Sequence, residues 1–199
     1  VDIFTIGNEE KWYNIDVFND ISALLSGEEI TIELAALKKD GGIGQFRSRS
    51  YGGNDEYAPY LEIVANGVTQ RIKAVDTAYI SPLENRNTNY KGEYLMVEEP
   101  VNSIFAGRNT NGKTPITVDV NRVVQPGVGV SITKDTKRIY LRFNTSNLSA
   151  SGIENASLKM YGKNAGGTGD MDITVFRTGN SGWSENTVKW TTFTDHLVF

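Results

Sequence analysis

The chain has 199 residues and a composition typical of a folded, β-rich protein. Hydrophobic residues make up 39% and charged residues 22%, and the 20 Gly suit short strands joined by turns. This composition excludes a disordered chain, and the length suits one large all-β domain better than two complete sandwiches. The net charge of −4 argues against binding to nucleic acid through clustered basic residues.

Missing residue types narrow the functional class further. There is no Cys, which excludes disulfides and thiol chemistry, and no run of about 18 apolar residues that would predict a membrane span. The single histidine, His196, stands close to the end of the sequence, so a Ser-His-Asp arrangement would depend on a terminal residue. We therefore expect a protein that is not an enzyme.

The first distinct element in chain order is one short helix, predicted over residues 19–26. Asn19 or Asp20 can cap its start and Gly27 ends it. Most of the remaining chain shows short alternating runs, in which every second residue is apolar, as in a half-buried strand. The clearest of these runs cover residues 30–34, 139–143, 156–161 and 173–175.

Residues 98–136 interrupt this pattern with three prolines and several Gly and Asn. Alternating apolar residues at 116–118 and 128–130 predict a β-hairpin inside a long insertion. The fold class that follows is an all-β, antiparallel, two-sheet β-sandwich with one short helix.

The order of the segments is unusual, because residues 1–64 look like the closing half of a β-sandwich and residues 73–199 begin like the opening half of one. Either two halves of adjacent repeats follow one another, or the two segments complete each other in a single domain over residues 1–199. We favour the single domain, because each half alone has too few strands to cover its own sheet.

Seven segments of the sequence form a pattern in two groups. The groups are 75–80, 87–97, 138–143 and 182–190, and 12–17, 46–49 and 59–63. They resemble the first and the second half, respectively, of the DNRLRE family of carbohydrate-binding-module-like domains. The resemblance implies a jelly-roll-like sandwich attached to secreted polysaccharide lyases, hydrolases and surface proteins, with alginate as a known type of ligand. The two halves of the family pattern stand in permuted order here, and residues 98–136 have no counterpart in it.

Candidate binding residues follow from the alternation of strand residues between two faces. Trp12, Trp183 and Trp190 match the family pattern and are predicted to pack in the core. Aromatic and basic residues on an outward sheet face would combine stacking surface with groups that bind carboxylates. The residues predicted to form this ligand-binding face are Arg49, Tyr51, Tyr140, Arg142, Lys159 and Tyr161.

No catalytic site, metal site or cofactor is predicted. Asp170 and Asp172 stand two residues apart after a Gly-rich turn, which leaves a structural calcium ion as an alternative to a solvated strand start. The adjacent acidic pairs at residues 28–29 and 98–99 are predicted to be solvated surface.

These features favour a noncatalytic carbohydrate-binding module at the cell surface or outside the cell. It would anchor a larger protein to an extracellular, acidic polysaccharide. The alternative is a structural repeat of an adhesin or filament that assembles with neighbouring repeats or subunits by strand exchange. A lyase or hydrolase is the third and least favoured interpretation.

Overall fold

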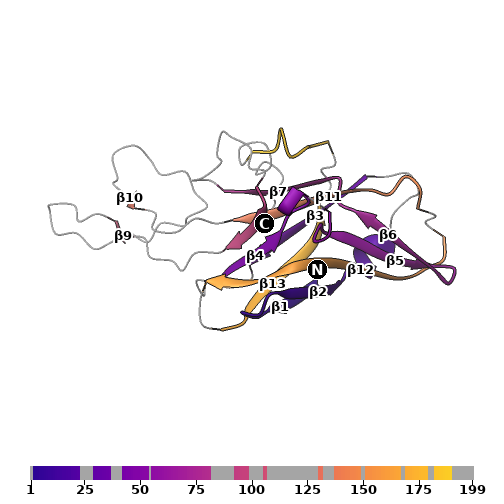
Figure 1. Cartoon of the computed structure of the whole chain (residues 1–199), viewed down its shortest axis with the longest axis horizontal. Coiled ribbons are helices and arrows are strands. Elements are labelled where there is room, and N and C mark those ends of the chain that lie inside the picture. Colours follow the sequence, from indigo (N-terminus) through magenta and orange to yellow (C-terminus); the bar gives the residue numbers. More distant parts are fainter. Residues whose placement is uncertain are drawn as a thin grey trace.

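The computed structural model is a sandwich of two antiparallel sheets, which confirms the predicted fold class (Figure 1). It describes residues 2–22, 29–36, 42–53, 55–81, 92–98, 105–106, 130–131, 137–148, 151–166, 169–178 and 182–189. None of the described helices is long and apolar enough to cross a membrane.

The first sheet, called sheet 1, has five strands. In spatial order they are β1 (Asp2–Ile6), β13 (Met171–Thr178), β3 (Glu29–Ala36), β11 (Arg138–Asn144) and β7 (Asp76–Ile80).

The second sheet, called sheet 2, has a path of five strands and a sixth strand beside it. The path is β6 (Val68–Lys73), β5 (Tyr60–Ala65), β12 (Ile153–Gly166), β4 (Ile43–Arg47) and β8 (Tyr94–Glu98), and β2 (Lys11–Asp16) also pairs with β12. β12 is the longest strand of the described chain, and it pairs with β2 on one edge and with β5 and β4 in succession on the other.

The inward faces of both sheets form one hydrophobic core, and the alternating runs in the sequence predict these faces correctly. The apolar residues of β3 and β11 point inward from sheet 1, and those of β12 point inward from sheet 2. The fully buried members of these strands are Ile30, Ile32, Leu34, Ile139, Leu141, Phe143, Ala156, Leu158 and Met160.

Strands from the beginning and the end of the chain alternate within both sheets. In sheet 1, β3 lies between β13 and β11, and in sheet 2, β12 lies among β2, β4 and β5. Residues 1–64 and 73–199 therefore pair with each other within the chain, and none of the described strands supports exchange with a neighbouring subunit.

The short helix α1 (Phe18–Ser22) occupies part of the predicted helical segment. It begins one residue earlier than expected, because the Asp16 side chain accepts a hydrogen bond from the Phe18 backbone N–H at 2.9 Å. Ile21 is buried in the common core, so the helix covers one end of the sandwich. Residues 23–28 lie outside the described residues.

A tight hairpin joins β5 to β6 and was missed in the sequence. Asn66 and Gly67 both have positive φ, at 50° and 72°, and the pair Ala65 and Val68 closes the two-residue turn. Asn-Gly is the sequence that such turns favour. Within the predicted insertion, β9 (Phe105–Ala106) pairs with β10 (Val130–Ser131) apart from both sheets (Figure 1). Residues 116–118 of the predicted hairpin lie outside the described residues.

Both sheets contain strands from the beginning and from the end of the chain, so we predict that neither part folds alone. Fragments 1–66 and 67–199, separated in the β5–β6 turn, should each aggregate or remain unfolded, because each would expose the apolar inner face that the other covers. Mixing them should restore one cooperative thermal transition measured by circular dichroism. Cooperative melting of either fragment alone would show two independent units instead.

Gly162 offers a local test of the packing around β12. A Cβ atom at this position would lie 2.4 Å from the backbone oxygen of Gln45, whereas a Cβ at Gly169 would meet nothing within 4 Å. Gly162→Ala should therefore lower the free energy of unfolding by about 1–3 kcal/mol, and Gly169→Ala should change it by less than about 0.5 kcal/mol. Denaturant titration of both variants measures the difference, and equal stabilities would contradict the close approach.

Candidate carbohydrate-binding face

The outer face of sheet 2 carries a continuous cluster of aromatic side chains, which we call the aromatic row. Neighbouring rings in it have centroids 4.6 to 6.4 Å apart, within the range of direct aromatic contact. The row crosses the strands of sheet 2, and its members are Trp12, Tyr60, Tyr161, Tyr57, Tyr51 and Tyr94.

Strand alternation places the row outside the core. In β2, Tyr13 and Ile15 point inward, so Trp12 points outward and keeps 40% of its surface exposed. It is paired in register with Tyr161 of β12, and the two rings meet edge to face at 5.5 Å. The prediction that Trp12 packs in the core is therefore wrong.

Arg47 fixes the end of the row near β8. Its guanidinium lies 3.6 Å from the centre of the Tyr51 ring, and its Nη1 donates a hydrogen bond of 2.7 Å to the Tyr94 hydroxyl. Nη2 lies 2.6 Å from a carboxylate oxygen of Glu10. Partial burial opposes the charged form of Arg47, but the hydrogen bond and charge of Glu10 raise its pKa, so Arg47 stays a cation whose charge Glu10 balances.

A second group of charges lies beside the other end of the row, on β5, β6 and β12. Lys159 and Arg71 both contact Glu62, at 3.3 and 2.9 Å. Burial would raise the pKa of Glu62, but the hydrogen bonds from these two cations lower it. Two positive charges thus share one carboxylate close to Tyr60 and Tyr161.

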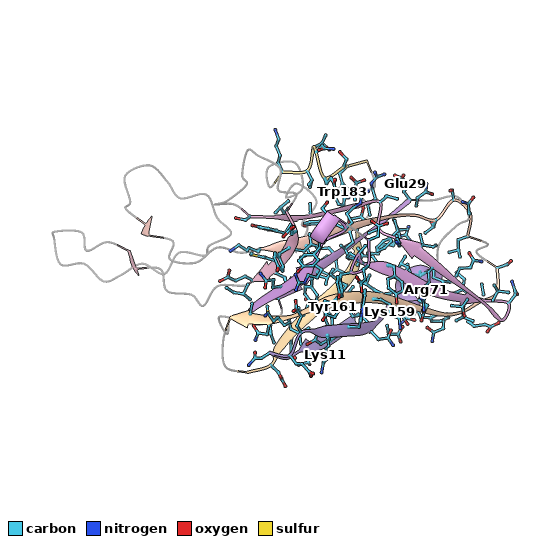
Figure 2. All side chains as sticks on the ribbon, viewed as in Figure 1. Lys11, Glu29, Arg71, Lys159, Tyr161 and Trp183 are labelled. Carbon is cyan, nitrogen blue, oxygen red and sulfur yellow. The ribbon has the colours of Figure 1, made fainter. Side chains whose placement is uncertain are left out.

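The six residues predicted as one ligand-binding face divide between the two sheets. Tyr51, Lys159 and Tyr161 lie on the outer face of sheet 2. Tyr140 and Arg142 lie on β11 of sheet 1, so the expectation of a single face is wrong. Figure 2 shows Lys159 and Tyr161 on one side of the sandwich, and on the other Trp183 and Glu29, which contact Tyr140 and Arg142 respectively.

Tyr140 points away from the common core, as alternation predicts, but it is only 1% exposed. The segment 182–189 covers it, and Trp183, Val188, Ala78 and Ile80 form a small second core around its ring. Burial, followed by the charge of Glu33, raises the pKa of Tyr140 well above its ordinary value. Trp183 is buried, as predicted, and donates a hydrogen bond of 2.8 Å to Thr31. Trp190 and His196 lie outside the described residues.

Arg49 and Arg142 take part in internal ion pairs on the side of sheet 1. Arg142 contacts Asp76 and Glu29, the latter at 2.7 Å. Strand β4 ends at Arg47, so the assumed alternation does not extend to Arg49, which instead lies 3.4 Å from Glu185. These contacts tie the 182–189 segment and the edge of sheet 1 together.

The described acidic residues named in the sequence analysis form no common site, and Glu28 and Glu99 lie outside the described residues. Glu98 is buried in an ion pair of 3.1 Å with Lys137, so its prediction as solvated surface is wrong. Asp172 accepts a hydrogen bond from the Thr5 hydroxyl at 2.8 Å. Across the described part of the chain, no three His, Cys, Asp or Glu residues gather as metal ligands would.

Comparison with known families finds a match to the model of carbohydrate-binding module family 96 over residues 68–193, more than half of the chain. Comparisons with curated proteins and with solved structures found no match. The family match begins at β6, so residues 1–67 with β1 to β5 lie before it. The resemblance to the DNRLRE family and the permuted order of its halves stay predictions.

The contacts of Arg142 predict a structural role. Arg142→Ala should lower the melting temperature by several degrees, because it leaves the buried Asp76 carboxylate without its guanidinium partner, at a cost of about 1–3 kcal/mol. Arg71→Ala removes an exposed ion pair of similar type and serves as the control, with little expected change. Scanning calorimetry would refute the role if both variants melted with the parent.

Proposed function

Because the chain belongs to carbohydrate-binding module family 96, we propose that it is a noncatalytic module whose aromatic row binds an acidic polysaccharide. The row is the observation that carries this proposal. Trp12 and the tyrosines around it present flat apolar faces together with hydroxyl groups, on a sheet face open to solvent. The apolar faces can pack against sugar rings while the hydroxyl groups bind sugar hydroxyls.

The extent of the row favours a polymer as the ligand. Its rings are contributed by β2, β12, β5 and β8 and by the turn between β4 and β5, so it spans most of the width of sheet 2. Each sugar unit would gain little alone. Several units of one chain bound along the row would add their contributions, and repeated modules in a larger protein would add avidity.

The charges around Tyr161 favour an acidic ligand. Lys159 and Lys163 stand two residues before and after Tyr161 on β12, so all three side chains lie on the same outer face, about 7 Å apart along the strand. Lys159 shares Glu62 with Arg71, which leaves one positive charge in surplus there. Carboxylate or sulfate groups along a polysaccharide would meet positive charge on both sides of a stacked ring.

The Glu62 carboxyl group beside the row is poorly suited to cleaving a glycosidic bond. A general acid in a glycosidase needs a raised pKa, whereas the pKa of Glu62 is lowered. Burial raises the pKa of Glu33, in opposition to Arg138, but this residue lies on β3 of sheet 1, among Arg138 and Tyr140. A role in attaching a larger secreted or surface protein to its polysaccharide fits this arrangement better than hydrolysis.

The proposal predicts that Trp12→Ala weakens binding to a soluble acidic polysaccharide by about tenfold or more, which corresponds to about 1.4 kcal/mol. Affinity gel electrophoresis with alginate and with other charged and neutral polymers in the gel measures the retardation. Ile3→Ala is the matched control, because Ile3 is an exposed apolar residue on β1 of sheet 1.

Melting temperatures of both variants must stay close to that of the parent for this comparison to hold. Binding by Trp12→Ala equal to that of the parent would contradict the proposed site. A parent protein that no polysaccharide retards would contradict the proposed function itself.

A further inference from the structure

The cations on the outer face of sheet 2 differ in how far the protein itself balances their charge. Arg47 is paired with Glu10 at 2.6 Å, and Lys73 with Asp55 at 3.0 Å. Lys159 and Arg71 share Glu62. A ligand that contacts any of these cations competes with a carboxylate of the protein.

Lys163 is the exception among these cations. It is half-buried on β12, and within the part of the chain that the structure describes it forms no ion pair. The buried neighbours Gly162 and Asn164 fix its direction, because alternation then places Lys163 on the outer face with Tyr161.

A side chain that ends in an amide stands opposite Lys163 on the neighbouring strand. Gln45 of β4 is the register partner of Lys163, and the Cβ atoms of such partners lie about 5 Å apart on one face of the sheet. The described residues provide no hydrogen-bond partner for the Gln45 side chain either. The ammonium group of Lys163 and the amide of Gln45 thus extend from paired positions on one face, and within the described residues neither has a partner.

We propose that Lys163 and Gln45 bind one carboxylate of a uronic acid unit in the polysaccharide, while the sugar ring bearing it or its neighbour packs on Tyr161. This inference rests on the proposed function. It assigns the preference of the binding face for acidic sugars to two residues. A planar carboxylate has two acceptor oxygens, one for the ammonium group and one for the amide. The separation from Tyr161 along the strand, about 7 Å, leaves room for a sugar ring between the aromatic face and its acidic group.

The closing experiment compares Lys163→Gln with Lys73→Gln in the full chain. Both substitutions remove one positive charge from the same face, but Lys73 is balanced by Asp55. Isothermal titration with a polyuronate oligosaccharide should show binding weakened about fivefold or more by Lys163→Gln and less than twofold by Lys73→Gln. The same oligosaccharide with its carboxyl groups reduced to alcohols should bind the parent and Lys163→Gln alike.

Gln45 adds a second, independent variant. Gln45→Glu places a carboxylate beside Lys163 and should weaken polyuronate binding at least as much as Lys163→Gln does. The double variant Lys163→Gln and Gln45→Ala should lose less binding free energy than the sum of the losses in the two single variants, because both residues would contact the same carboxylate.

The outcomes separate this inference from the proposed function. Unchanged polyuronate binding by Lys163→Gln, with binding lost in Trp12→Ala, would overturn the carboxylate site and leave the aromatic site standing. If Lys163→Gln weakens binding to a sulfated polysaccharide more than binding to the polyuronate, the assignment of the site to a carboxylate would be overturned. Unchanged binding in Trp12→Ala would overturn the aromatic site, and a parent protein that binds no polysaccharide would overturn the proposed function.

Discussion

The pairing of β12 with strands from the beginning of the chain is the constraint on which the rest of the structure depends. β12 lies between β2 on one edge and β5 and β4 on the other, and all three of these partners come from residues 1–65. Gly162 makes the close approach to β4 sterically feasible. The same pairing brings Trp12 into contact with Tyr161 and Tyr60, so the core and the aromatic row arise from one set of contacts.

The two outer faces of the sandwich differ in how their aromatic residues are covered. Within the described residues, another segment of the chain covers the aromatic residue on sheet 1 but not the aromatic row on sheet 2. On sheet 1 the segment 182–189 lies over Tyr140, and Trp183 completes a small apolar cluster there. On sheet 2 the aromatic row lies at the surface, with the ring of Trp12 among the most exposed large apolar groups. Aromatic residues on a covered face contribute to stability, and those on the open face can contact a ligand.

The family match covers only part of the residues that form the aromatic row. The match covers residues 68–193, which contain β6 to β13. Residues 1–67 contribute Trp12, Tyr51, Tyr57 and Tyr60 to the aromatic row. Most of the proposed binding surface is therefore assembled from residues outside the family match, and its ligand must be established on this chain.

The sequence predicts the features that depend on strand periodicity. It does not predict the features that depend on packing between distant segments. Alternation identifies the inward faces of β3, β11 and β12, because one side of each strand is buried. The same alternation could have placed Trp12 correctly. Tyr13, Ile15 and Val17 alternate along the chain, which leaves Trp12 on the opposite, outer face. No local pattern shows that residues 182–189 cover Tyr140, or that β11 and β12 belong to different sheets.

The most direct test of the account is to map the ligand contact on the two outer faces at once. In an NMR titration with an acidic oligosaccharide, the indole N–H signal of Trp12 and the backbone amides around Tyr161 should shift with ligand concentration. The indole N–H signal of Trp183, which is buried and bonded to Thr31 on the side of sheet 1, should stay unchanged. Shifts confined to Trp183 and β11, with Trp12 unaffected, would contradict the assignment of the binding face to sheet 2.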